Sequence, residues 1–198
     1  MIENLVKQNV ILMKLGITKT DSFNNNFNLN LLLNIAEFER GTEVDSSKYI
    51  EIESPELIHY LRVGDLQSLG NTFITPDDSD KIAEFDDILV AFDGAPGRNN
   101  IGLIGAYSSG IYNLKCSEEN KGLVYFEINS KINRKIIDDH SQGTTILHAS
   151  KSINYLRYAN INYNEKQLLN SYLNLILQNK KKINSLKHIK ANLLNKYF

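Results

Sequence analysis

The feature that most constrains the fold is a run of regularly spaced side chains at the end of the chain. From Asn164 onward the sequence contains no Pro or Gly, and eight positions step by alternating three and four residues. This spacing is a heptad seam, and it predicts a coiled-coil helix over residues 161–198 that packs against one partner helix. A terminal helix packed on its own domain is the alternative. The seam consists of Leu169, Tyr172, Ile176, Asn179, Ile183, Leu186, Lys190 and Leu193.

The residues before this helix predict a mixed α/β (α+β) domain over residues 29–160. Short apolar, β-favouring runs at 58–63, 87–92, 101–107 and 111–114 are separated by turn residues, as in a hairpin or meander. Residues 119–137 favour a helix, with Ser117 as a candidate N-cap. Residues 1–28 predict a short amphipathic helix at 2–17 and a linker at 20–26, with no evident role.

Charge is unevenly distributed along the chain, although the net charge is only −1. Residues 1–100 hold 8 Lys/Arg against 17 Asp/Glu, whereas residues 101–198 hold 14 against 6. A basic half can face phosphates while the whole molecule stays nearly neutral, although a solvated basic helix would give the same count. With no membrane-length apolar run, no signal peptide and Cys116 as the only cysteine, we expect a cytoplasmic protein without disulfides.

Catalytic and cofactor motifs are missing from the sequence. The four histidines have no metal-ligand helical spacing, and no Walker loop, dinucleotide-binding glycine motif or Asn/Asp-Pro-Pro-Tyr methyltransferase motif occurs. We therefore predict no catalytic, cofactor or metal site, and a non-enzymatic protein. One alternative is a Mg²⁺-dependent nuclease, because Asp77 and the later Glu119-Asn120-Lys121 imitate a carboxylate, carboxylate-x-lysine set. Another is a coiled-coil adaptor with a protein-binding, β-rich head.

Several segments, taken in order, resemble the specificity subunit of type I restriction–modification systems. The most characteristic is Asp87–Arg98, which is similar to the family's Asp-Ile-Leu-x-x-x-Asp-Gly-x-x-Gly stretch. Tyr60–Leu66 is similar to its Tyr-Ile-Arg-x-x-Asp-Ile strand, and Gly143–His148 to its Gly-Thr/Ser-Thr-x-x-His stretch. The entry at Leu33–Gly41 and the ending at Leu186–Phe198 also resemble the family.

The resemblance implies a sequence-specific DNA-binding protein made of one target-recognition domain and one spacer helix. In the family the helix sets the distance between two recognition domains and docks the methyltransferase subunits, and through them the restriction subunits. S-adenosylmethionine, ATP and Mg²⁺ would then belong to partner subunits. Because the family usually carries two domains and two helices, this chain resembles a half-subunit. We expect a homodimer through the seam, with Asn179 and Lys190 fixing its register.

The predicted DNA contacts divide into residues that read bases and residues that hold phosphates. Arg98, Asn99 and Asn100 flank a glycine-rich hairpin tip, where Arg suits guanine and Asn suits adenine, although the glycines would shape a tight turn in any case. The basic residues are candidates for phosphate contacts. The full set is Arg62, Arg98, Asn99, Asn100, Lys115, Lys131, Arg134, Lys135, Thr144, Thr145 and Lys151. The DNA motif itself depends on loop geometry, which the sequence leaves open.

Overall fold

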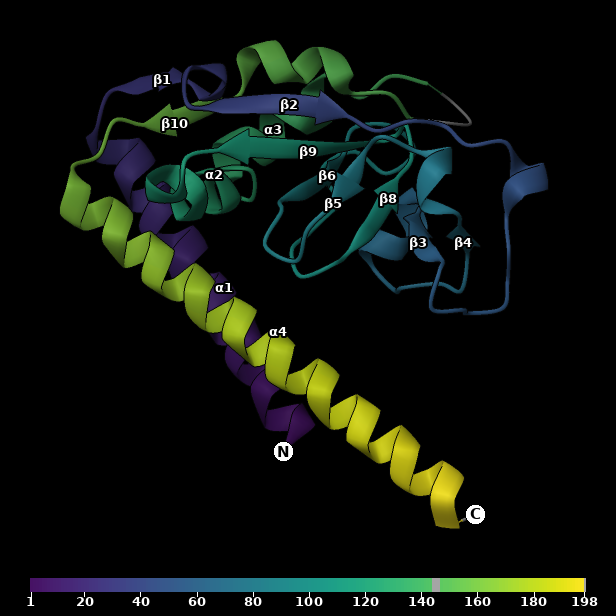
Figure 1. Cartoon of the computed structure of the whole chain (residues 1–198). Helices are drawn as coiled ribbons and strands as arrows, with labels where there is room; N and C mark the ends of the chain where they lie inside the picture. Colours follow the sequence, from purple (N-terminus) through teal and green to yellow (C-terminus); the bar gives the residue numbers. More distant parts are fainter. Residues whose placement is uncertain (144–146, 198) are drawn as a thin grey trace.

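Two long antiparallel helices form an arm along one side of the molecule (Figure 1). The computed structural model describes residues 1–143 and 147–197. Helix α1 spans Ile2–Asn26 and helix α4 spans Tyr163–Tyr197, so the predicted terminal helix is confirmed. The predicted linker at 20–26 is wrong, because these residues continue α1. Thr20 and Phe23 are buried, and the side chain of Asn24 is bonded to Glu127.

The domain carried by this arm is a mixed α/β unit, and its described residues form three small sheets. One sheet has the strand order β2-β9-β6-β7 and is antiparallel throughout. A second has the order β4-β3-β8-β5, with β3 and β8 parallel, and β1 pairs with β10. The strands are β1 Leu29–Leu31, β2 Ala36–Arg40, β3 Ile58–Leu61, β4 Phe73–Ile74, β5 Ile82–Ala83, β6 Leu89–Ala91, β7 Asn99–Asn100, β8 Gly105–Tyr107, β9 Ile111–Cys116 and β10 Arg157–Ala159.

The β6 strand separates two apolar cores because its alternate side chains point to opposite faces. Ile88 and Val90 join the larger core, which the helices cover and which includes Phe126 and Leu169. Leu89 and Ala91 join a smaller core with Tyr107 on β8. The apolar run at 87–92 is therefore buried on both faces, which explains why its sequence shows no alternation.

The helix predicted over 119–137 is divided into two. Helix α2 spans Lys121–Glu127 and α3 spans Lys131–Asp139. Ser130 starts α3 as its N-cap by accepting a hydrogen bond from the backbone N–H of Asn133 at 3.4 Å. Ser117 takes the cap position of the 3-10 turn Glu118–Asn120, but its side chain makes no capping hydrogen bond.

Most of the heptad seam, through which we expected a homodimer, is buried within the single chain. Leu169, Ile176 and Ile183 are buried, and Asn179 donates a hydrogen bond to Asn9 Oδ1 of α1 at 2.9 Å. This part of the seam packs against α1 and α2 of the same chain and joins the larger core of the domain, as in the alternative of a terminal helix packed on its own domain. Asn179 therefore makes an intramolecular contact with α1. Only the last turns of α4 extend beyond the start of α1 (Figure 1), and Leu193 there is exposed.

The arm's length does not make it a membrane segment. Within the described ranges, no helix is both long enough and apolar enough to cross a lipid bilayer.

Candidate nucleic-acid interface

The predicted hairpin tip lies between β6 and β7 and is fixed by its surroundings. Gly94 and Gly97 both have φ of +78°, a left-handed conformation that side chains other than glycine rarely adopt. The carbonyl oxygen of Gly97 accepts hydrogen bonds from Arg134 on α3 and, at 2.9 Å, from the side chain of Asn99. These two glycines are therefore required by the turn, and α3 supports the tip from one side.

The three side chains proposed to read bases are engaged within the protein. Arg98 donates from Nη1 to the carbonyl oxygen of Val63 at 3.3 Å, and Asn99 exchanges hydrogen bonds with Asn129. Asn100 Nδ2 donates to Leu66 O at 2.8 Å, and its Oδ1 accepts from Lys180 Nζ at 2.7 Å. Contact of any of the three with a base would require these bonds to be exchanged.

The bond to Asn100 also ties the helical arm to the domain. Lys180 belongs to α4, and its side chain packs closely against Gly102. Burial lowers the pKa of the Lys180 ammonium to about 8, because a charged group is less well solvated there than in water. Asn100 is thus part of the contact between α4 and the α/β domain.

A cleft of about 500 Å³ opens beside the hairpin tip and includes Arg62, Asp65, Asp93 and Gly110 in its lining. Arg62 is half exposed, and its guanidinium carbon lies 5.9 Å from the ring centroid of Tyr49. Asp65 accepts the backbone N–H of Arg62 at 2.7 Å, which fixes the start of the 3-10 turn Val63–Leu66. The structure therefore places the predicted Arg62 at an accessible cleft wall.

Two exposed basic side chains that contact Asp93 in the cleft wall were not among the site residues predicted from the sequence. Arg40 and His148 both contact Asp93. Arg40 is the last residue of β2, directly before Gly41, and His148 ends the Gly143–His148 stretch. Each belongs to a segment that resembles the family pattern, which was the available signal.

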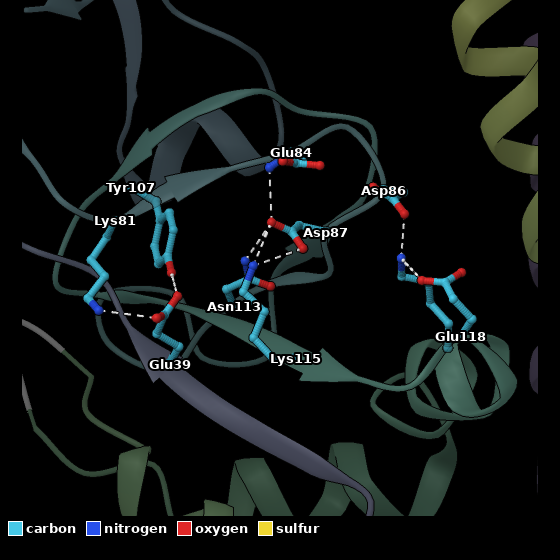
Figure 2. Close-up of polar contacts among 10 residues, drawn as sticks. Glu39, Lys81, Glu84, Asp86, Asp87, Tyr107, Asn113, Lys115 and Glu118 are labelled. Atoms are coloured by element: carbon cyan, nitrogen blue, oxygen red, sulfur yellow. Dashed lines mark hydrogen bonds and ion pairs between the residues drawn. The ribbon is translucent and has the colours of Figure 1, made fainter. Parts of the chain in front are cut away.

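Lys115 lies apart from the tip, on the outer part of β9, within a network of charged side chains (Figure 2). Its Nζ lies 3.0 Å from Asp87 Oδ2, and Asp87 also accepts from Asn113 at 2.7 Å. In the same network Tyr107 donates to Glu39 at 2.6 Å, and this bond keeps the pKa of Glu39 below its ordinary value. The positive charge of Lys115 is therefore balanced by the Asp87 carboxylate in the chain without DNA.

The remaining predicted phosphate contacts lie on α3 and after it. Lys131 and Lys135 are exposed on α3, and Lys151 is exposed in the 3-10 helix Ser150–Tyr155 that packs beside α3. Thr144 and Thr145 lie outside the described residues. The structure thus gathers Arg62, Arg98 and Arg134 around the tip and leaves the exposed lysines on a neighbouring surface.

The residues of the nuclease alternative are engaged in separate contacts. Asp77 lies in the 3-10 turn Pro76–Asp78, whereas Glu119 accepts a hydrogen bond from Lys166 of α4 at 2.7 Å. Lys121 is paired with Asp86 and Glu118. Within residues 1–143 and 147–197, no three His, Cys, Asp or Glu side chains are grouped so that they could hold a metal ion.

Comparison with solved structures places the fold among specificity subunits of type I restriction–modification systems. The S subunit from M. genitalium matches with a TM-score of 0.63 and 17% identity over 100% of this chain and 56% of its own. The HsdS subunit from Thermoanaerobacter tengcongensis matches with a TM-score of 0.58 and 12% identity over 93% of this chain and 48% of its own.

A third structure, from work on complex assembly and conformational transition of the type I R-M system, has a TM-score of 0.59 at 14% identity. The match covers 98% of this chain and 52% of that structure's chain. This chain therefore spans about half the length of each of the three proteins. No family model and no curated protein matches the sequence. The mixed α/β fold with its long C-terminal helix is therefore the fold of these S subunits.

Proposed function

We propose that this chain is a DNA-recognition subunit of a type I restriction–modification system. The observation that carries the proposal is the shared fold, which extends over 93–100% of this chain in S subunits. The recognition domain would read one DNA half-site with the hairpin tip and the adjoining cleft. The arm formed by α1 and α4 would dock methyltransferase subunits and, through them, restriction subunits.

A half-subunit needs a second recognition domain to specify a site in a genome, since one domain reads only a few base pairs. Two copies of this chain would together match the length of one S subunit. We therefore include a homodimer in the proposal, formed by the part of the arm that α1 and α4 leave exposed. The chain itself would be non-catalytic, with S-adenosylmethionine, ATP and Mg²⁺ bound by the partner subunits.

Selection from a random-sequence duplex library tests the recognition role directly. Purified chain should enrich a defined motif over successive rounds, and its affinity for that duplex should fall as salt rises, because binding releases counterions from the phosphates. A protein-binding adaptor would enrich no motif and would show no salt-dependent affinity for DNA. That outcome would refute the proposal.

Two alanine substitutions, made separately, should distinguish a residue that reads bases from one that contacts phosphates. Arg98→Ala is expected to weaken binding to the selected duplex by about 1–3 kcal/mol and to leave a scrambled duplex nearly unaffected. Lys151→Ala should weaken both duplexes alike and reduce the slope of log K against log salt by roughly one. Titrations of both duplexes at several salt concentrations distinguish the two patterns. Unchanged cognate affinity in Arg98→Ala would exclude the tip as a reading element.

A further inference from the structure

The segment after α3 is bonded to the residues that follow β6. Gly94 N donates to Leu147 O at 2.8 Å, and Ala149 N donates to Phe92 O at 2.7 Å. An isolated antiparallel bridge therefore joins Asp93 and His148. Two parts of the chain that are more than fifty residues apart are held side by side next to the cleft.

Asp93 stands at the centre of this junction and holds two basic side chains. Its Oδ1 accepts from His148 Nδ1 at 2.9 Å, and its Oδ2 lies 3.3 Å from Arg40 Nη2. The Asp93 side chain is 13% exposed, whereas His148 and Arg40 are 62% and 57% exposed. The carboxylate is covered, and the two groups that it orients face outward.

The orientation of Arg40 is fixed by two further contacts. Its Nε donates to Ser109 O at 2.8 Å, and its guanidinium carbon lies 5.9 Å from the ring centroid of Tyr112. Among the contacts of the described residues, Arg40 Nη1 has no acceptor. A guanidinium fixed in this way loses little conformational entropy when it binds a ligand.

The contact with Asp93 also fixes the orientation of the His148 imidazole. A carboxylate can only accept, so the proton of the neutral ring resides on Nδ1, and Nε2 is left available. His148 therefore presents a single ring nitrogen of defined position beside the free edge of a fixed guanidinium.

The charges around the cleft favour a base edge over a phosphate as the ligand. Arg40 and Arg62 stand beside three carboxylates, those of Asp93, Asp65 and Glu43. With two guanidinium groups against three carboxylates, this group exerts no net attraction on an anion. Its fixed donors instead match a pair of neutral acceptors, and guanine O6 and N7 offer such a pair in the major groove.

We propose that Asp93 is a positioning residue that presents Arg40 and His148 to the bases of the DNA half-site, with Arg40 contacting a guanine. This inference rests on the proposed function and adds specificity-determining residues to it. His148 contacts the neighbouring base pair through Nε2. Asp93 touches no DNA and acts through the two side chains that it holds.

Selection from the random-sequence library is the test, using wild type, Arg40→Ala, Arg40→Lys, His148→Ala and Asp93→Asn. Wild type should select guanine at one position by about 10- to 100-fold, and both Arg40 variants should lose this preference while keeping the rest of the motif. His148→Ala should relax one adjacent position, and Asp93→Asn should relax both. Lys48→Ala, which changes a surface ion pair with Asp78, is the control and should select the wild-type motif.

The outcomes separate this inference from the proposed function. If wild type selects a motif and the Arg40 variants select the same motif with equal preference at every position, the inference is wrong and the DNA-recognition role stands. If wild type selects no motif, both are wrong. Thermal unfolding of each variant provides the folding check. Arg40→Lys keeps the charge, so its loss of guanine preference would reflect geometry and not general destabilisation.

Discussion

Glu127→Ala is expected to destabilise the protein by about 3 kcal/mol, because it removes the acceptor at the centre of a buried hydrogen-bond network. Glu127 is fully buried at the end of α2. Its Oε1 accepts the backbone N–H of Ala159 on β10 at 2.9 Å, and its Oε2 accepts from Asn24 of α1 at 2.9 Å. The side chain of Asn133 on α3 donates to Oε2 at 3.4 Å. One carboxyl group therefore joins four elements, and denaturant titration would measure its contribution.

The same residue should make stability depend on pH in a defined direction. Burial raises the pKa of Glu127 to about 7 in the folded state, against an ordinary value of 4.5. A raised folded-state pKa means that the folded protein holds the proton more tightly than the unfolded chain does. The stabilisation is therefore complete below about pH 4.5 and is lost as the pH rises through 7.

Glu127→Gln is the matched control, because it keeps the size of the side chain and cannot ionise. Asn24 Oδ1 is buried and has no hydrogen-bond partner among the described residues, so turning the Asn24 amide over would let it accept from the new amide group. We expect the variant to unfold at a higher temperature than wild type at pH 8 and near the wild-type temperature at pH 5. An unchanged difference between the two proteins across this range would contradict a pKa near 7.

The helical arm shows where local sequence was insufficient to predict the fold. The Asn-rich residues 20–26 have low helix propensity and suggest a linker. Tertiary contacts outweigh this preference, since Phe23 is buried and Asp21 accepts the backbone N–H of Lys131 at 2.9 Å. These partners lie about a hundred residues away, so no pattern within α1 could indicate them.

At the candidate site, the strand and the turn were predictable from the sequence, whereas the hydrogen bonds of the side chains around them were not. The Asp87–Arg98 segment indicated a strand and a glycine turn, and β6 and the turn at Gly94 and Gly97 confirm this. Which side chains remain available depends on hydrogen bonds formed by the folded chain. Asn100 was a candidate reader but holds Lys180, whereas Arg40 was passed over and is held outward by Asp93.

We expect the last turns of α4, which extend beyond the start of α1, to contribute to a dimer interface. Ile183 is buried within the chain, so Ile183→Asp would disrupt the helix pair itself and cannot test association. Leu186 is half buried, and Lys190 and Leu193 are exposed. Ile189 and Leu193 are 55% and 52% exposed, and α1 adds Val10, Ile11 and Leu15 to the apolar surface of the arm. Burying this exposed apolar surface in an interface would lower the free energy, which favours association.

The double variant Ile189→Asp, Leu193→Asp is therefore expected to convert a dimer into a monomer and to abolish specific DNA binding, with the recognition domain still folded. Each carboxylate would have to be buried in an apolar interface, which costs several kcal/mol. Asn184→Asp is the matched control. It adds a carboxylate at an exposed position on the opposite face of α4 from Leu193 and should leave the dimer intact. Sedimentation velocity over a range of protein concentrations measures both.

Salt provides an independent test of the same interface. From Lys166 onward α4 carries seven lysines and no Asp or Glu, so two arms brought together repel each other. Salt screens this repulsion, and dimerisation should tighten with ionic strength while DNA binding weakens. A two-fold dimer would also impose an interrupted palindrome on the selected DNA motif, because half-site symmetry follows protein symmetry. A chain that stays monomeric at all salt concentrations, or a motif with two unrelated halves, would indicate pairing with a different half-subunit.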